Sequence, residues 1–398
     1  MPSYDYDYII AGGGAAGLSL AYHLGLVGLN DQRVLLVDQI AKTSNDRTWC
    51  FWEIGDGPFE PIVTRSWDKL WLHGHEHSAR ESIAPYRYKM IEGSAFYRFM
   101  DDWLAEQPQF ERRLGKVERF DDHGDAVTAW VDGQPVRARW VFSSIYQPGP
   151  RDPNYAYWLQ HFKGWVITAP RPIFDPEAAT FMDFRVAQAD DVRFMYVLPY
   201  DAHTALVEYT IFSADLVDHA VYEAGLRTYI HGLLGLESYA IQHVEYGVIP
   251  MTDTPFVRHP SPRVLRIGTA GGLTKASTGF TFQRIQRDSA QIATSLRDHG
   301  RPLVYIPSAR HALMDGVLLN VLEHNRESGS LFFERLFRNN RPQQVLRFLD
   351  EDTSLIEDMA LMGTVNLPAF MVASADVVVR RMRAASTRRR LTEATSSS

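Results

Sequence analysis

A glutamate interrupts an otherwise apolar strand pattern near the middle of the chain. Residues 205–212 read ALVEYTIF, and a period of two places Glu208 on one face with Leu206, Thr210 and Phe212. Burial between such neighbours would raise the pKa of the carboxyl and keep it protonated, as a general acid for weakly basic carbon requires. The same pattern also fits an edge strand whose glutamate faces water, so the residues alone leave both interpretations open.

A glycine fingerprint lies close to the N-terminus. Gly12, Gly14, Ala15 and Gly17 follow a short apolar run, a helical pattern comes next, and a second buried strand ends at Asp38. In a β-α-β unit such glycines let backbone N–H groups meet a pyrophosphate at the helix N-terminus, and the acid accepts hydrogen bonds from ribose hydroxyls. Because all the parts occur in order, we predict a dinucleotide site rather than a flexible glycine turn.

A polar and aromatic cluster follows the second strand, where residues 46–52 read DRTWCFW. Arg47 could reach phosphate or carbonyl groups of a cofactor, and the rings of Trp49 and Trp52 could wall a pocket. The alternative is a packed loop that carries a surface arginine.

Three histidines alternate at residues 73–77, which read HGHEH. Alternate side chains of a strand share one face, so His73, His75 and His77 could hold a metal ion. No carboxylate-rich partner and no histidine pair at helical spacing follows them. We therefore expect an exposed polar strand edge and no metal site.

The elements that must position these groups follow an α/β order. Residues 110–142 have the pattern of a meander, residues 155–250 are rich in strands, and a hairpin is expected around residues 199–204. A short strand at 264–267 runs into a glycine-rich segment, and a helix follows from about residue 282 to 297. A nucleotide-binding domain thus resumes late in the chain, before a mostly helical region at 308–383.

Composition restricts the class of protein. The chain has 398 residues, of which 45% are hydrophobic and 22% charged, and its net charge is -7. These values are typical of soluble globular proteins and argue against disorder and nucleic-acid binding. The 12% of aromatic residues would suit a pocket for a flat or polyunsaturated ligand.

The sequence also indicates the cellular compartment in which the protein is expected. Cys50 is the only cysteine, which excludes disulfides and fits a reducing environment. Residues 1–8 are acidic and lack the basic region of a signal peptide, so we expect a cytoplasmic protein. Two uncharged stretches, at 8–30 and 359–375, are interrupted by glycine, asparagine or proline and do not read as membrane spans.

Ordered motifs extend along almost the whole chain, as far as Ala373. They are residues 12–17, 46–52, 86–91 (YRYKMI), 207–210 (VEYT), 267–282 (IGTAGGLTKASTGFTF) and 345–355 (VLRFLDEDTSL). In these motifs the chain resembles the lycopene beta-cyclases of the bacterial, flavin-dependent type, which share ancestry with geranylgeranyl reductases and aromatic hydroxylases. The resemblance implies an α/β fold with a Rossmann-like FAD-binding domain, a strand-rich substrate domain and a helical C-terminal region.

The resemblance also implies roles for individual residues. Glu208 matches the essential glutamate of an acidic pair in the family, and Tyr209 stands where the second acid would be. Thr269 occupies the place of an aspartate that related hydroxylases use to bind the flavin ribityl chain. Further residues implied at the cofactor are Arg47, Gly268, Gly271 and Gly272, with Ser143 and Ser144 beside it.

The implied activity is the acid-base cyclisation of the linear psi ends of lycopene and other linear carotenoids to beta rings. It involves no net electron transfer, uses FAD in the reduced form, and needs NAD(P)H only as an external reductant. Glu208 would be the acid, and Trp52, Tyr88, Thr210 and Phe280 would line the substrate pocket. The rival activities are an FAD monooxygenase, a prenyl or carotenoid reductase, and a carotenoid-binding flavoprotein without catalysis.

A hydrocarbon substrate implies contact with a membrane surface. Residues 331–337 form an apolar helical stripe suited to lying on a bilayer, although the same stripe also fits the protein core. Six arginines between residues 380 and 390 make a basic tail that could rest on anionic lipid or remain a disordered end. We expect peripheral attachment and no spanning helix.

The expected domains are discontinuous. The FAD-binding domain takes residues 1–50, 93–150 and 260–300, and the substrate domain takes 51–92 and 151–259. A helical region at 301–383 and a flexible basic tail at 384–398 complete the chain.

Overall fold

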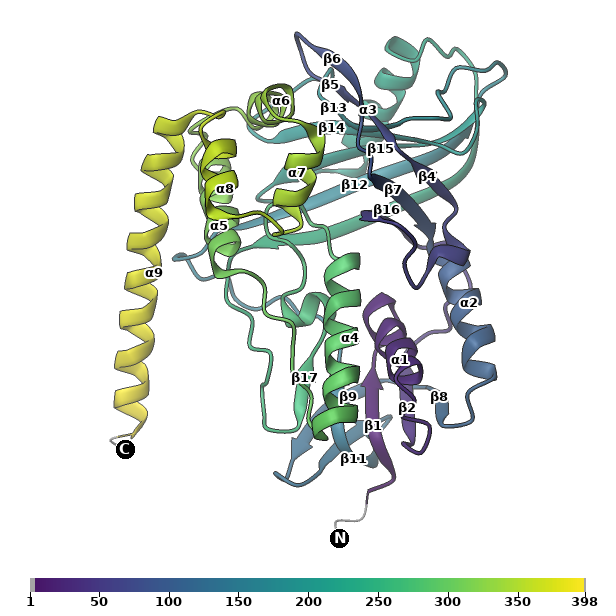
Figure 1. The fold of residues 1–398 in the computed structure, drawn as a ribbon, viewed down its shortest axis with the longest axis vertical. Helices are drawn as coiled ribbons and strands as arrows, with labels where there is room; N and C mark the ends of the chain where they lie inside the picture. The colour runs from purple at the N-terminus through teal and green to yellow at the C-terminus, as the bar shows by residue number, and fades with distance from the viewer. Residues whose placement is uncertain (1–3, 397–398) are drawn as a thin grey trace.

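Two large sheets form the body of the protein. The computed structural model describes residues 4–396, with side chains as far as residue 386. The first sheet has the order β8-β2-β1-β11-β10-β9, with β17 beside β11, and forms the lower part of Figure 1. Its strands are β1 (Tyr6–Ala11), β2 (Val34–Asp38), β8 (Phe110–Leu114), β9 (Val117–Asp122), β10 (Val127–Val131), β11 (Gln134–Ser143) and β17 (Val264–Arg266).

The second sheet crosses the upper part of the molecule. Its order is β16-β12-β15-β14-β13-β5-β6, so β16 lies at one edge. The strands are β5 (Lys69–His73), β6 (Ser78–Ser82), β12 (Tyr157–Thr168), β13 (Ala179–Asp183), β14 (Val192–Pro199), β15 (Thr204–Ser213) and β16 (Ala240–Thr252). The hairpin expected around residues 199–204 is the β14-β15 pair.

A small third sheet links the two large ones. It consists of β3 (Thr48–Ile54), β4 (Arg65–Trp67) and β7 (Tyr86–Glu92), in the order β3-β7-β4. Phe51 of β3 packs into the core of the first sheet, whereas Trp52 packs into the core of the second. Residues 51–92, expected in the substrate domain, are therefore shared between the third sheet and strands β5 and β6.

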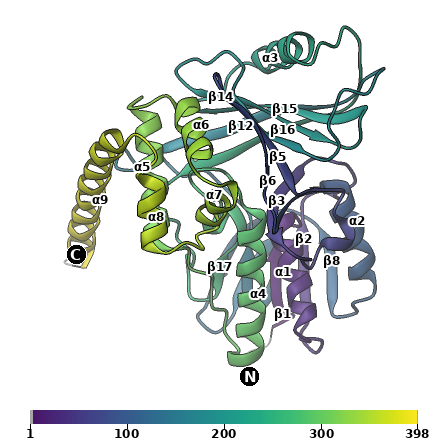
Figure 2. The same cartoon turned by 45° about the horizontal axis from the view of Figure 1, so that its top comes forward.

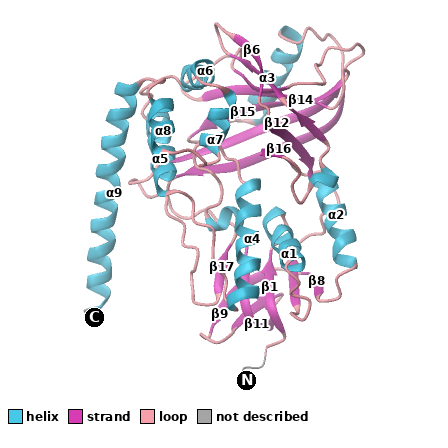
Figure 3. Cartoon of the chain, viewed as in Figure 1, coloured by secondary structure: helices cyan, strands magenta, loops and turns pink. Residues whose placement is uncertain are grey.

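Helices cover both large sheets, as the colouring of Figure 3 makes clear. They are α1 (Ala15–Leu26), α2 (Gly93–Ala105), α3 (His219–Gly232), α4 (Phe282–His299), α5 (Ala309–Glu323), α6 (Gly329–Asn339), α7 (Pro342–Leu349), α8 (Leu355–Met362) and α9 (Leu367–Ser396), with short 3-10 helices η1 (Glu60–Ile62) and η2 (Gly268–Gly271). Of the helices in the described part of the chain, none combines the length and the hydropathy that a bilayer span needs.

The N-terminal β-α-β unit forms because β1 and β2 are short, buried and parallel. Gly12 has φ +105°, which favours glycine, and a side chain there would meet Ser144. A Cβ at Gly17 would lie 1.9 Å from the carbonyl oxygen of Gly12, so only glycine lets α1 start this close to β1. The two glycines thus set the start of α1 at the carboxyl end of β1.

The second sheet separates two apolar cores. Val207, Tyr209 and Ile211 of β15 face α3, whereas Leu206 and Phe212 face the C-terminal helices. This is the alternation expected from the sequence of β15. Figure 2 shows α3 beyond one face of the sheet and α5 to α8 gathered near the other.

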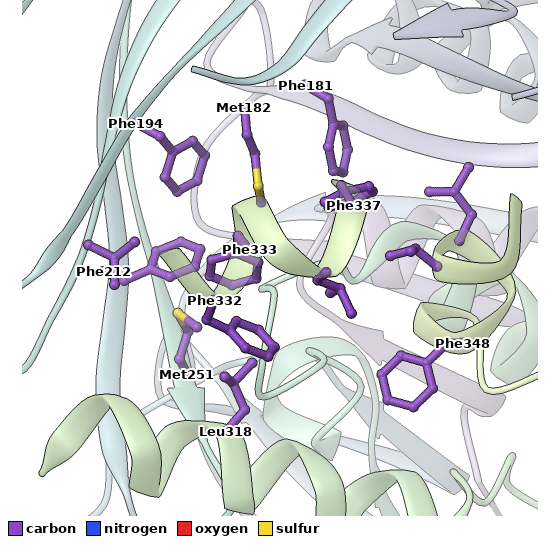
Figure 4. Close-up of a cluster of buried hydrophobic side chains, with 14 of the residues drawn as sticks. Phe181, Met182, Phe194, Phe212, Met251, Leu318, Phe332, Phe333, Phe337 and Phe348 are labelled. Atoms are coloured by element: carbon purple, nitrogen blue, oxygen red, sulfur yellow. The ribbon is translucent and has the colours of Figure 1, made fainter. Parts of the chain in front are cut away.

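The apolar stripe at residues 331–337 belongs to the second of these cores. Phe332, Phe333, Leu336 and Phe337 of α6 are buried. Figure 4 shows the three phenylalanines among side chains of the sheet and of other C-terminal helices. Phe337, for example, lies with its ring centroid 5.8 Å from that of Phe181 on β13. Of the two interpretations of the stripe, the structure has the core for these four side chains, whereas Leu331 is 41% exposed.

The C-terminal basic segment also differs from expectation. Helix α9 continues to Ser396, so residues 384–396, expected as a flexible tail, belong to a helix in the structure. Arg380 pairs with Glu323 and Asp376, and Arg381 pairs with Asp253. The side chains of Arg388, Arg389 and Arg390 lie outside the described part of the chain.

Candidate active site

A cavity of about 460 Å³ lies where the first sheet meets the second. The N-terminus of α1 contributes Gly14 and Ala15, and β15 contributes Glu208 from the opposite side. Strands β3, β7, β12, β14 and β16 and the loop before α4 supply further parts of its wall. The cavity thus brings together the glycine turn and the acid that are far apart in the sequence.

Glu208 is buried at the wall of this cavity. The hydroxyl of Thr210, two residues along the strand, donates a 2.9 Å hydrogen bond to Glu208 Oε1. Burial, and then the neighbouring carboxyl of Glu245, raise the pKa of Glu208 well above its usual value. Of the two interpretations that the sequence left open, the structure has the buried carboxyl and not the water-facing edge.

Glu245 is a second buried carboxyl that the sequence analysis did not identify. Strands β15 and β16 flank β12 on opposite sides, and both Glu208 and Glu245 pair with Gly164 of β12. The two carboxyl groups meet across this glycine and interact directly. A Cβ at residue 164 would lie 3.0 Å from Glu245 Cγ, so the absence of a side chain leaves room for the contact.

The sequence around Glu245 conceals its burial. In β16 the side chains of Val244, Tyr246 and Val248 are exposed, while Glu245 between them is 5% exposed. An alternation rule would place the apolar side chains inside and the glutamate outside. A small residue on the neighbouring strand, Gly164, is the signal that could have indicated an inward-facing glutamate.

Aromatic side chains form much of the remaining wall. Tyr88, Tyr196 and Phe280 line the cavity. Trp52, predicted in the pocket, instead packs behind Phe280 with ring centroids 4.7 Å apart, and does not line this cavity. Thr210, also predicted there, lies fully buried behind Glu208 and contacts it through its hydroxyl.

The glycine turn has the geometry that a dinucleotide requires. A Cβ at Gly14 would have no neighbour within 4 Å, so open space lies at the N-terminus of α1. Asp38 Oδ2 accepts a 2.6 Å hydrogen bond from the amide of Gly13, which holds the carboxyl at the end of β2. Asp38 lines a second cavity of about 300 Å³, and Lys42 lines both cavities.

Arg47 lies at the entrance of the larger cavity. It is one of the lining residues, and 62% of its side chain is exposed. Asp46 Oδ2 lies 3.5 Å from its Nε. This placement fits both interpretations that the sequence left open, an arginine that reaches a cofactor and a surface arginine of a packed loop.

The late glycine segment packs beside the N-terminus of α1. Thr269 lines the cavity, but Gly268, Gly271 and Gly272 do not. A Cβ on these three glycines would meet Ala16, the carbonyl oxygen of Arg266 and the ring of Phe256 respectively. Small residues are needed here because η2 packs tightly against α1 and its own neighbours. The role of these three glycines at the cofactor stays a prediction.

The three alternate histidines form no metal centre in the structure. His73 Nδ1 lies 2.8 Å from the hydroxyl of Ser78, and the backbone amide of His75 donates to Glu334. Across the described residues, no set of three or more His, Cys, Asp or Glu side chains is arranged to hold a metal ion.

The profile of one protein family, described as "Lycopene cyclase protein", matches residues 7–376. The chain belongs to the lycopene cyclase family. The match includes the glycine turn, Glu208, Glu245 and the loop before α4, so all the groups that form the cavity lie within the family region.

Two curated relatives are similar over much of this chain. One is a chloroplastic neoxanthin synthase of Solanum tuberosum, 25% identical over 302 residues, which cover 70% of this chain and 58% of that protein. The other is a lycopene beta-cyclase of Pseudescherichia vulneris, 27% identical over 312 residues, which cover 75% of this chain and 76% of that protein. The chain thus spans less than two thirds of the neoxanthin synthase.

The fold is shared with solved structures of low sequence identity. A flavoprotein/dehydrogenase from Cytophaga hutchinsonii superposes with a TM-score of 0.59 at 11% identity, over 95% of this chain and 99% of that one. The likeness shows that the Rossmann-type α/β architecture expected from the sequence is the observed one.

Proposed function

We propose that the protein is a lycopene beta-cyclase. The observation that carries the proposal is the buried carboxyl of Glu208, which faces an aromatic cavity in a chain of the lycopene cyclase family. Cyclisation needs an acid that stays un-ionised near neutral pH, exclusion of water and electron-rich faces near the developing cation. The cavity supplies the acid through Glu208 and the electron-rich faces through Tyr88, Tyr196 and Phe280.

The chemistry is a proton-initiated ring closure. Glu208 gives its carboxyl proton to C-2 of a linear psi end, which leaves a tertiary cation at C-1. The neighbouring double bond attacks C-1 and closes a six-membered ring, and loss of a proton from C-6 gives the beta ring. The rings of Tyr88, Tyr196 and Phe280 line the space in which the cation forms. One proton enters and one leaves, so the product is an isomer of the substrate.

We further propose that the cofactor is FAD. Gly14, Ala15 and the N-terminus of α1 would hold the pyrophosphate, Asp38 the adenosine ribose, and Arg47 a phosphate or carbonyl group. The reduced flavin, replenished by NAD(P)H, would supply negative charge near the cation without transferring electrons. Thr281, at the N-terminus of α4, lines the cavity, and the positive end of that helix favours an anion there.

The reaction class can be tested in heavy water. We expect each closed ring to gain one deuteron at C-2, because the proton added by Glu208 exchanges with solvent and then stays on the product. Purified enzyme, lycopene and anaerobically reduced FAD are incubated in deuterium oxide, and the product is analysed by chromatography and mass spectrometry. Addition of one oxygen would instead establish a monooxygenase, and uptake of two hydrogens with matching NAD(P)H loss would establish a reductase. Binding of lycopene without any product would leave only a carotenoid-binding flavoprotein.

We also propose a peripheral membrane contact, because the substrate is a hydrocarbon that resides in the bilayer. The surface we assign to it is the edge strand β16, since residues 248–250 line the cavity and the outer side chains of the strand are exposed. These exposed side chains are Ile241, Val244, Tyr246 and Val248. An apolar surface that continues into the cavity lets the substrate enter without crossing water.

The double substitution Val244→Ser and Val248→Ser is expected to weaken binding to liposomes about tenfold, because two exposed apolar side chains no longer enter the bilayer. Sedimentation with vesicles of mixed neutral and anionic lipid measures the effect. The matched control is Ile356→Ser with Met359→Ser on α8, where the side chains are 79% and 66% exposed. Weakening by the control pair alone would move the membrane contact to α8 and contradict the assignment.

A further inference from the structure

Two buried carboxyls from different strands meet in this site. Glu208 and Glu245 lie on either side of β12 and share Gly164 as their partner in the ladder. Only Glu208 lines the cavity, while Glu245 lies behind it. Strands two places apart in a sheet are separated by roughly 9–10 Å, so two glutamate side chains can span the gap only by pointing toward each other.

The hydrogen bonds show what holds the pair in place. The hydroxyl of Thr210 donates to Glu208 Oε1, and the hydroxyl of Thr48 donates to Glu245 Oε2 over 2.7 Å. An ionised carboxylate has no hydrogen to donate, so a hydrogen bond between the two carboxyl groups requires a proton on one of them. Two ionised carboxylates in contact away from water would repel strongly. The pair therefore holds at least one proton.

The surroundings favour the negative charge on Glu245. Burial raises the pKa of Glu245, with a smaller contribution from Glu92, while the contact with Glu208, the hydrogen bond from Thr48 and the nearby His243 act to lower it. The pKa of Glu208 is raised further, because the carboxyl of Glu245 adds to the effect of burial. Around Glu208 the other titratable groups are Tyr88, Tyr196 and Cys50, and burial raises the pKa of each of them. These three stay neutral, so the charge that Glu208 experiences comes mainly from Glu245.

We infer that Glu245 is a positioning residue that keeps the transferable proton on Glu208 and directs that carboxyl at the cavity. The catalytic part of this inference rests on the proposed function, since it takes Glu208 as the acid of the cyclisation. After Glu208 has given its proton to the substrate, two negative charges face each other beside the carbocation. They stabilise the cation, and their repulsion favours return of a proton to Glu208 before the next turnover.

The variant Glu245→Gln tests this inference through its pH dependence. The acid form of Glu208 is required, so activity falls as pH rises through the pKa of Glu208. Removing the neighbouring negative charge lowers that pKa, and the falling limb should move to lower pH by about one unit. Glu245→Asp retains a carboxylate and should stay closer to the wild-type profile. The matched control is Glu223→Gln, which removes a glutamate paired with Lys163 and outside the cavity.

A second readout does not depend on turnover. The infrared band of protonated carboxyl groups is followed from neutral to alkaline pH in wild type and in Glu245→Gln. We expect this band to disappear at lower pH in the variant. An unchanged midpoint would overturn the inference, and so would a Glu245→Asp profile equal to that of Glu245→Gln. If wild type lacked cyclase activity, the proposed function would fail while the infrared titration still decided whether the two carboxyls share a proton.

Discussion

Turnover by Glu208→Gln is expected to fall by about 100- to 10,000-fold, the usual contribution of a general acid. Glutamine keeps the size of the side chain, and its carbonyl oxygen can still accept the hydrogen bond from Thr210. It has no proton acidic enough to transfer to an alkene carbon. The loss should therefore appear in the rate of the chemical step and not in folding or flavin content.

The measurement is single-turnover conversion of lycopene by enzyme with reduced FAD, together with flavin absorbance and the melting temperature. Tyr209→Phe is the matched control. Tyr209 stands at the position of the family's second acid, yet its side chain lies in the core under α3 and does not line the cavity. The control should retain turnover near that of wild type. Near wild-type turnover by Glu208→Gln would move the proton source to another residue.

The parts of the site that could be predicted from the sequence are those whose structure depends on residues close together in the chain. The glycine turn was predictable because a strand, closely spaced glycines, a helix and Asp38 are all local in the chain. The face of β15 that carries Glu208 was predictable because its neighbours alternate regularly. In both segments the local preference and the tertiary packing agree.

Glu245 could not be predicted because its environment is created by another strand. Its own strand places Val244 and Tyr246 outward, against the usual alternation, and Gly164 of β12 provides the space that it fills. The two buried carboxyls of this site thus come from two strands, and residue 209, where the family has its second acid, is a tyrosine. Pairing across a sheet leaves little trace in the sequence of one strand alone.

The stripe at residues 331–337 shows a second limit of predicting structure from the spacing of apolar residues. An amphipathic helix presents the same spacing of apolar residues to a membrane and to a protein core. What decides between them is whether other elements cover the face, and here Phe181 and Phe184 on the sheet side contact Phe337 and Phe333. That information lies in distant segments and becomes available only with the fold.

The variant Gly14→Val is expected to lose nearly all bound flavin while keeping its fold. Gly14 has φ -87°, which valine can adopt, and a Cβ there meets no atom of the protein within 4 Å. The added side chain fills the space at the N-terminus of α1 where the pyrophosphate would lie. Flavin absorbance of the purified protein and its melting temperature measure the two effects. Gly232→Val, on α3, is the matched control, since a Cβ there also meets nothing within 4 Å.

Gly17→Val separates loss of the cofactor from loss of the fold. Its Cβ would lie 1.9 Å from the backbone oxygen of Gly12, which cannot move without displacing β1 or α1. This variant should lose flavin because the β-α-β unit is destabilised, so its melting temperature falls as well. Gly14→Val should lose flavin with a melting temperature close to that of the wild-type apoprotein. A yellow Gly14→Val protein with full flavin absorbance would show that the cofactor does not lie at this helix N-terminus, and the cavity beside Asp38 would then need another occupant.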